Sequence, residues 1–289
     1  IPSQRLVRIM QLTEKASAAA KLWQPALVSL FLSMVFMPVH ASTMRRQGDF
    51  YGYWGWNNAT YSDSDIHFRG EGHDFTLYDV RAEDRQTDFN LHEIFHSYLN
   101  PGRITIPQYN WRFGYFVMDN WSVSLGWDHM KYVMVQDQTV DASGDIDRNG
   151  IQRDYGLDGS EKLTKDFLTF EHTDGFNQIS LETEGYLPVF NWKDRVDLAL
   201  FAGFGVGIMY PKSNVTLLGG ERNDEWHVAG HSTLVKVGFE ASLWKDFFFR
   251  FIGKYGYADM DDVLTSNKGD KASQKIYYDE YIGALGMRF

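Results

Sequence analysis

The chain of 289 residues contains no cysteine, and this absence excludes several kinds of chemistry. Without thiols there is no disulfide framework, no cysteine nucleophile and no sulfur-ligated zinc site, so any metal has to be held by nitrogen or oxygen ligands. Proline is also scarce, with 7 residues, whereas glycine numbers 26 and aromatic residues make up 16% of the chain. This composition favours β structure with bulky rings on a surface over long amphipathic helices.

Basic residues are in the minority, with 28 Lys and Arg against 38 Asp and Glu, which gives a net charge of −10. The phosphates of a nucleic acid would be repelled by such a surface, so we expect no nucleic-acid partner. Divalent cations are the more compatible ligands.

Long apolar runs are absent except near the N-terminus, at residues 23–39. This run follows Lys15 and Lys21 and ends at a small-residue cleavage pattern that closes with Ala41. We therefore predict a signal peptide over residues 1–41, with residues 1–9 as candidate upstream translation before Met10. A transmembrane anchor is the alternative, but the run is short and contains two prolines.

The rest of the chain is rich in segments in which apolar and polar residues alternate, as in β-strands. Near the C-terminus Phe249 and Phe251 alternate with Arg250, and residues 277–289 repeat the pattern. A transmembrane barrel places such rings against lipid and such charges in a narrow interior. The interior charges are predicted to pair and to leave no open pore; they are Arg112, Glu182, Glu184, Lys236, Glu240, Arg250, Lys254, Glu280 and Arg288.

Very short connections at residues 119–120, 191–194 and 244–246 alternate with long polar ones, which is the asymmetry of outer-membrane barrels. Residues 42–289 are thus predicted to form one all-β domain, a transmembrane antiparallel up-and-down β-barrel in the bacterial outer membrane with long extracellular loops and both ends periplasmic. Ten strands are the alternative, because residues 58–102 contain two more strand-like segments, and a secreted β-sandwich is another. The eight predicted strands are 49–57, 103–117, 121–135, 174–189, 195–210, 228–243, 246–258 and 277–289.

The last residue, Phe289, ends a strand whose alternate positions are apolar. This ending is similar to the C-terminal aromatic signal of Gram-negative outer-membrane proteins. We predict that Phe289 is an assembly signal, with the barrel assembly machinery as its partner.

Several short segments carry a family resemblance: SDIHF at 64–68, DFTL at 74–77, DHMK at 128–131, FEHTDGFN at 170–177 and FGVG at 204–207 followed by Pro211. Together they resemble the lipid A oxidase-like eight-stranded outer-membrane barrels over most of residues 48–289. The resemblance implies a barrel that contacts or modifies lipopolysaccharide. It does not by itself establish oxidase activity.

A candidate lipid-contacting pair lies on the strand that contains DHMK. His129 and Lys131 continue the outward parity of Trp127, at the distance from the periplasmic turn where a strand of roughly 9 to 11 residues leaves the hydrocarbon. We predict that they face the outer-leaflet headgroups and contact the phosphates of lipid A. In the family reading, Asp65, Asp74 and Asp79 are their polar partners. Interfacial anchoring without chemistry is the alternative.

The string HEIFH at residues 92–96 matches a zinc-hydrolase pattern, in which His92 and His96 hold the metal and Glu93 is the base. A third ligand at recognisable spacing is missing, so a metalloprotease is disfavoured. We predict a short amphipathic loop helix with Ile94 and Phe95 packed inward; a simple two-histidine metal site is the alternative.

A calcium-loop pattern begins at Asp145, Asp147 and Asn149, followed by Gly150. The twelfth position is Gly156 in place of a bidentate glutamate, so the match covers only the first half. Ca²⁺ is therefore a candidate cofactor, and a solvated acidic loop is the alternative.

Two classes of function remain open. One is an enzyme or binder that acts on lipopolysaccharide at the outer rim. The other is a structural or adhesive barrel whose loops contact the exterior.

Overall fold

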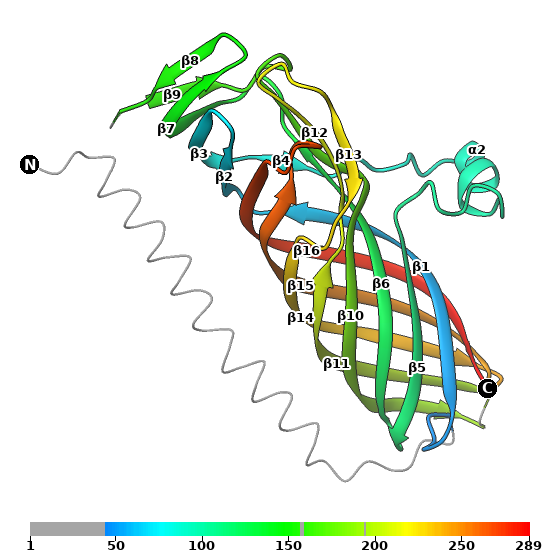
Figure 1. Ribbon diagram of the computed structural model, residues 1–289. Helices are drawn as coiled ribbons and strands as arrows, with labels where there is room; N and C mark the ends of the chain where they lie inside the picture. Colours follow the sequence, from blue (N-terminus) through cyan, green and yellow to red (C-terminus); the bar gives the residue numbers. More distant parts are fainter. Residues whose placement is uncertain (1–43, 157–158, 194) are drawn as a thin grey trace, which may run out of the picture.

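The computed structural model describes residues 44–156, 159–193 and 195–289, so the predicted signal peptide lies outside the described residues. Within these ranges eight antiparallel strands form a closed barrel, because the last strand pairs back with the first (Figure 1). The prediction of an eight-stranded up-and-down barrel is confirmed. In order around the barrel the strands are β1 (Phe50–Tyr61), β5 (Tyr109–Met118), β6 (Trp121–Met134), β10 (Leu168–Trp192), β11 (Val196–Met209), β14 (Gly230–Leu243), β15 (Phe247–Leu264) and β16 (Lys271–Arg288).

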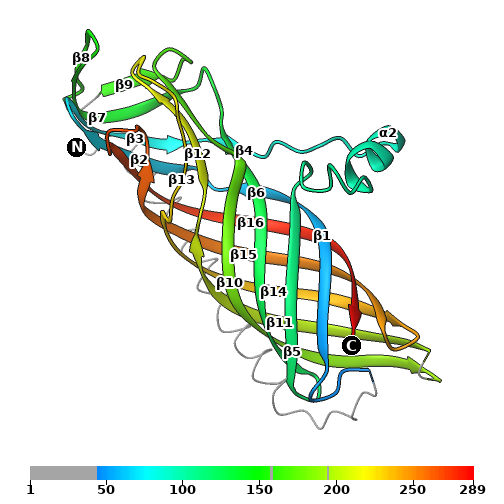
Figure 2. The ribbon, with the colours of Figure 1, turned by 45° about the vertical axis from the view of Figure 1, so that its right-hand side comes forward.

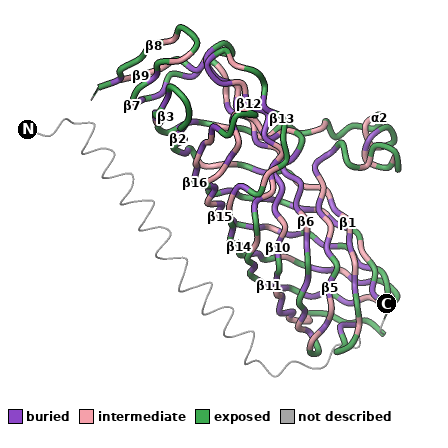
Figure 3. The backbone as a smooth tube through the Cα atoms, in the orientation of Figure 1, coloured by how far each residue is buried: buried purple, intermediate pink, exposed green. Residues whose placement is uncertain are grey.

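Along most of each barrel strand, buried residues alternate with more exposed ones (Figure 3), and residues 175–178, at the bulge in β10, are an exception because all four are buried. On β16, Tyr281 and Leu285 are exposed, whereas Glu280 and Ile282 are buried. Large apolar side chains therefore cover the outside of the barrel wall, as a lipid environment requires. No helix among the described residues is long and apolar enough to cross a membrane.

The two ends of the barrel differ in the length of their connections. At one end, here called the closed end, the connections are short: β5 joins β6 through residues 119–120, and β14 joins β15 through residues 244–246. Asn120, Trp244 and Lys245 have positive φ there, as tight turns demand. The seam between the first and the last strand also closes here, where the backbones of Phe50 and Phe289 exchange two hydrogen bonds of 2.9 and 3.0 Å.

At the opposite end the sheet continues beyond the barrel into an extracellular extension (Figures 1 and 2). The hairpin of β2 (Ser64–Gly70) and β3 (His73–Val80) pairs with the start of β16 and with β7. It lies above β1 and does not insert into the barrel wall, so the barrel has eight strands rather than ten. The other strands of the extension are β4 (Ala82–Glu83), β7 (Thr139–Arg148), β8 (Ile151–Asp154), β9 (Gly159–Lys162), β12 (Lys212–Leu217) and β13 (Asn223–Trp226).

Charged side chains fill the middle of the barrel interior. Arg112 lies 2.7 Å from Asp128 and 2.6 Å from Glu182, and Lys236 pairs with both Glu182 and Glu184. All nine predicted interior charges are buried, with at most 4% of the residue exposed. Each buried ion has a partner of opposite charge, which offsets the cost of removing it from water.

Two apolar clusters complete the interior. In the first, rings such as Tyr51, Phe201 and Phe248 pack among the ions, around the guanidinium of Arg250. In the second, Phe68, Phe170 and Phe176 belong to a larger core that continues into the extracellular extension. Arg45, which precedes β1, enters from the closed end and bridges Asp197 at 2.6 Å and Glu240 at 2.8 Å. The interior is thus a packed core and not a channel.

The predicted strand boundaries fail mainly at the extracellular side. The strand predicted to begin at residue 103 begins at Tyr109, because residues 101–107 form turns around Pro101, Gly102 and Pro107. The strands predicted at 174–189, 246–258 and 277–289 each run several residues farther outward, since they also carry the extension.

Candidate functional site

A polar cluster lies on the outer face of the wall, where β5, β6 and β10 are neighbours. Asn177 accepts a hydrogen bond from Trp127 Nε1 at 3.1 Å, and its Oδ1 lies 2.8 Å from Nδ1 of His129. The Nδ2 of Asn177 donates to the carbonyl of Tyr210 at 3.2 Å. Tyr109 stacks on the imidazole of His129 with ring centroids 4.8 Å apart. We call His129, Asn177, Trp127 and Tyr109 the wall cluster.

A β-bulge in β10 makes room for the wall cluster. The pairing of β10 with β6 shifts between His172 and Phe176, and Gly175 adopts φ +138° at this point. A Cβ atom on Gly175 would lie 2.2 Å from Asn177 Nδ2. Residues 173–177, with the pattern T-D-G-x-N, therefore have a structural role here. The glycine allows the backbone to turn at the bulge, and the amide of Asn177 completes the wall cluster.

The hydrogen bonds fix the roles of the two imidazole nitrogens of His129. Asn177 Oδ1 is the acceptor, since the Nδ2 of the same amide donates to a carbonyl. Nδ1 of His129 is accordingly the donor, and in the neutral ring Nε2 carries the lone pair. The wall cluster can thus hold a histidine in one tautomer, with Nε2 available to accept a proton or hydrogen bond.

Positive charge gathers on the same outer face, just beyond the wall cluster. Lys131 follows two residues after His129, and its Nζ donates to the carbonyl of Ile106 at 3.0 Å. Farther along β6 and β10 lies a groove of about 330 Å³ lined by Arg85, Lys165 and Arg222 together with the single carboxylate Glu171. Arg85 pairs with Glu171 at 3.3 Å, and the other two cations lack such a partner in that groove's lining.

The side chains of His129 and Lys131 are on the outward-facing side of β6, as predicted from the alternation. The register of β6 against β5 runs without a shift from Trp127 to His129, and the inward position between His129 and Trp127 is taken by Asp128. His129 is only 8% exposed, since neighbouring rings cover it, whereas Lys131 is half-buried. Asp128, which contacts Arg112 and Lys254, was not predicted as an interior charge, although its parity with Ser122 and Ser124 indicates that position.

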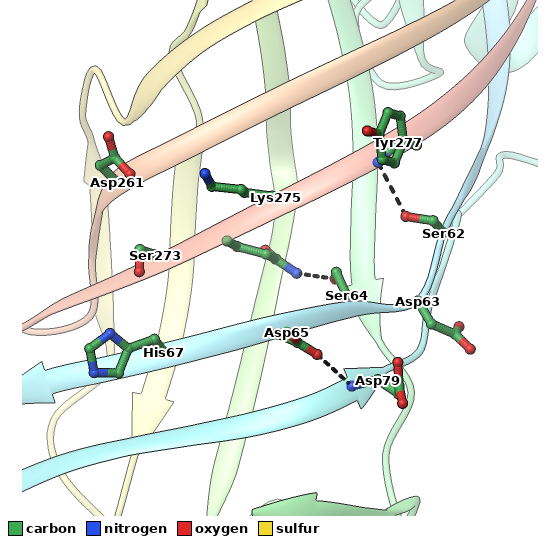
Figure 4. A pocket seen from close by; sticks show the side chains of 11 residues that line it. Ser62, Asp63, Ser64, Asp65, His67, Asp79, Asp261, Ser273, Lys275 and Tyr277 are labelled. Carbon is green, nitrogen blue, oxygen red and sulfur yellow. Dashed lines mark hydrogen bonds between the residues drawn. The ribbon is translucent and has the colours of Figure 1, made fainter. Parts of the chain in front are cut away.

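The three aspartates predicted as partners lie elsewhere, on the β2–β3 hairpin beside β16. Asp65 and Asp79 line a pocket of about 390 Å³, and Asp65 Oδ1 accepts a hydrogen bond of 3.0 Å from the backbone of Asp79 (Figure 4). Asp74 contacts His67 at 2.8 Å. The hairpin pairs with β16, and the short β4 that follows it pairs with the outer end of β6 at Val133 and Met134, beyond His129. The structure thus brings Asp65 and Asp79 together, and among the described residues no hydrogen bond or ion pair joins them to His129.

The acidic pocket in Figure 4 perturbs the titration of one of its carboxyls. Burial, followed by the charges of Asp65, Asp63 and Asp141, raises the pKa of Asp79. Asp79 also has φ +52°, a backbone conformation that aspartate tolerates better than most residues.

The HEIFH string forms a short helix at the edge of the molecule, composed of α2 (Leu91–Glu93) and the π-helical turn η1 (Ile94–Tyr98). The rings of His92 and His96 stack at 4.9 Å, and Glu93 accepts a hydrogen bond of 2.5 Å from Ser97. Phe95 is 71% exposed. The predicted loop helix is present, but the prediction that Phe95 packs inward is wrong because the helix projects away from the barrel.

The calcium-loop pattern lies on a β-hairpin. Asp145 and Asp147 are on β7, and residues 149–150 form the tight turn into β8, with positive φ at both. Asp147 pairs with Gln152, and Asn149 donates to the carbonyl of Leu218. In the part of the chain that the structure describes, no three His, Asp or Glu residues are arranged to hold a metal ion. Ca²⁺ binding remains a prediction from the sequence.

Two belts of aromatic residues encircle the apolar wall. Trp54, Trp56, Tyr109, Trp127 and Tyr210 lie toward the extension, and Phe50, Trp192, Trp244, Phe247 and Phe289 lie at the closed end. Aromatic girdles at both interfaces, an apolar band and a packed polar interior are the features of a transmembrane barrel. The chain is an outer-membrane β-barrel.

No protein-family model matches the sequence, and no curated protein matches it. Among solved structures the barrel is similar to the outer membrane protein OprG from Pseudomonas aeruginosa, at 14% identity over 85% of this chain and 97% of that one, with a TM-score of 0.40. Ail from Yersinia pestis is 13% identical over 84% and 99%, with a TM-score of 0.32, and Neisserial surface protein A is 10% identical over 84% and 100%, with a TM-score of 0.35. Likeness at this level carries no information about function.

Proposed function

We propose that this outer-membrane barrel contacts the lipid A of lipopolysaccharide at the outer-leaflet rim and modifies it there. The observation that carries the proposal is the wall cluster, a fixed histidine on the lipid-facing side of the barrel with cations next to it. A polar side chain on that face costs free energy unless it is hydrogen-bonded, and Asn177 meets that need for His129. The resemblance to lipid A oxidase-like barrels supports the same assignment.

The cations near the wall cluster indicate a substrate that carries phosphate groups. Lys131 and the groove of Arg85, Lys165 and Arg222 offer positive charge close to the wall cluster, on the side where headgroups begin. Lipid A is an acylated sugar with phosphates, so its chains fit the apolar wall and its phosphates fit these cations. In this proposal the ring of His129 meets the sugar and Nε2 accepts a hydrogen bond from it.

Mass spectrometry of lipid A from cells with and without the gene tests the proposal. We expect a mass-shifted lipid A species only when the wild-type protein is present, and we expect His129→Ala to abolish it. Lys131→Gln should reduce the species, whereas Lys275→Gln, a matched change of an exposed lysine on β16, should leave it unchanged. A heat-modifiable mobility shift on gels confirms that each variant is assembled.

Identical lipid A spectra with and without the protein would contradict the modification. That result would favour the second class of function, a structural or adhesive barrel that works through its extracellular extension.

A further inference from the structure

Residues 88–106, here called the lateral loop, connect the extracellular extension to β5. In both views α2 stands to the side of the barrel, next to the outer end of β5, and not above the barrel interior (Figures 1 and 2). A loop in this position runs along the membrane surface rather than away from it.

The lateral loop exposes its apolar side chains. Phe89 is 80% exposed, Leu91 78% and Phe95 71%, which exceeds the 50% of the lipid-facing Leu125. Leu91 and Phe95 lie four residues apart on the short helix, and Leu99, directly after its end, continues this spacing, so the three form an exposed apolar stripe. The loop is amphipathic, since His92, Glu93 and His96 contact one another away from this stripe.

Two contacts tie the lateral loop to the lipid-facing wall. The ring of Tyr98 meets the ring of Trp56 edge-on at 5.8 Å, and Trp56 belongs to the outer aromatic belt. On the return limb, the carbonyl of Ile106 accepts the hydrogen bond from Lys131 on the outward face of β6. The loop is therefore attached at the level where aromatic belts meet the membrane interface.

We propose that the lateral loop is an in-plane membrane anchor, whose stripe of Leu91, Phe95 and Leu99 inserts among the acyl chains of the outer leaflet. An amphipathic helix of this kind buries its apolar face at the boundary between headgroups and chains. The occupant of the stripe is the lipid surface, because the exposed stripe belongs to a loop that is attached to the outer aromatic belt through Tyr98 and to the outward face of β6 through Ile106. The inference needs only a bilayer and does not depend on lipid A chemistry.

The absence of cysteine makes the test direct, since single cysteines can be labelled without a background. Phe95→Cys, Leu125→Cys and Lys268→Cys are labelled with bimane, and the full-length mature barrel is folded into phosphatidylcholine vesicles that carry bromine on the acyl chains. Leu125 reports the apolar wall, and Lys268 is an exposed residue of the loop between β15 and β16. The heat-modifiable gel shift verifies folding of each variant.

We expect bromine to quench bimane at position 95 about as strongly as at position 125, and little at position 268. Quenching at 125 without quenching at 95 would overturn the proposal. A disulfide-linked dimer of unlabelled Phe95→Cys that accompanies unquenched bimane would show instead that a second copy covers the stripe. Because these vesicles contain no lipopolysaccharide, failure of the proposed lipid A function would leave the expected quenching unchanged.

Discussion

Asn177 satisfies three polar neighbours on a wall that otherwise faces lipid, and a single glycine makes this possible. Gly175 turns the backbone at the bulge, and its missing side chain leaves the space that the amide of Asn177 occupies. The sequence pattern T-D-G-x-N suggested a functional segment through a resemblance. The physical reason for the pattern emerges only from the bulge, which alternation of residue types does not reveal.

Gly175→Ala is expected to destabilise the barrel and to disrupt the wall cluster. The side chain would collide with Asn177, and the positive φ would add strain of roughly 1–3 kcal/mol. Gly253→Ala on β15 is the matched control, because a Cβ there meets no atom within 4 Å. Urea unfolding in detergent micelles measures both; equal midpoints for the two variants would contradict the role of Gly175.

Lys236→Met tests whether the interior ions depend on one another. Lys236 contacts both Glu182 and Glu184, so its loss leaves two buried carboxylates with one cation fewer. Removing one partner of a buried pair costs about 3–5 kcal/mol, and we expect a loss of that order in unfolding free energy. The exposed pair of Lys162 and Asp137 provides the control, since Lys162→Met should cost at most about 1 kcal/mol.

At the scale of elements, alternation located every barrel strand, and the turns between strands set the topology. The strand at 228–243 was placed within two residues of β14, because both of its ends are marked by turn residues. Alternation does not mark the point where a strand leaves the membrane, so the outward extents of β10, β15 and β16 were underestimated. The role of Arg45 was also missed, since a single arginine before the first strand carries no pattern.

The extracellular extension is held together by an ion pair that responds to acid. Arg148 of β7 contacts Asp270, in the loop between β15 and β16, at 2.6 Å. Burial alone would raise the pKa of Asp270, but the hydrogen bonds from Arg148, Ser266 and the backbone of Glu71, together with the charge of Arg148, outweigh burial and lower the pKa. A carboxyl with a lowered folded-state pKa stabilises above its unfolded pKa of about 3.9, and this stability is lost as pH falls through the folded value.

We therefore expect Asp270→Asn to loosen the β7–β8 hairpin at neutral pH. The difference from wild type should disappear only as pH falls below about 3.9 and through the lowered folded-state pKa, where the wild-type carboxyl is itself protonated. Hydrogen exchange of the hairpin amides, corrected for intrinsic rates, is measured for both proteins at neutral and at acidic pH. If the amides of the wild type and of Asp270→Asn exchanged at equal rates at pH 7, this role for the ion pair would be contradicted.

Phe289 closes the seam of the barrel and is also the predicted assembly signal. Its ring lies 6.2 Å from that of Phe50, and its backbone completes the seam of the barrel. If the C-terminal aromatic is also an assembly signal, deletion of Phe289 should lower the amount of protein in the outer membrane more than it lowers folding yield in detergent. Glu93→Gln, in the lateral loop, should change neither quantity. Equal effects of the deletion in cells and in detergent would assign Phe289 to the seam alone.

At the scale of the whole molecule, the barrel is closed inside and chemically distinctive outside. Ion pairs and two apolar clusters fill the interior, so function has to lie on the outer wall or on the extension. The polar residues of the wall cluster, the adjacent cations and the lateral loop all lie around the outer ends of β5 and β6. In the proposed function, lipid A binds in this region.

Site-specific photo-crosslinking in living cells tests this contact most directly. A benzophenone amino acid replaces Lys131 beside the wall cluster or, as a control, the lipid-facing Tyr255 on β15, and lipopolysaccharide adducts are detected by immunoblot after irradiation. We predict strong adducts from position 131 and weak ones from position 255, with loss of the adduct at 131 when Arg85 and Arg222 are changed to Gln. Equal adducts at the two positions, or none at position 131, would contradict a lipid A site on this wall.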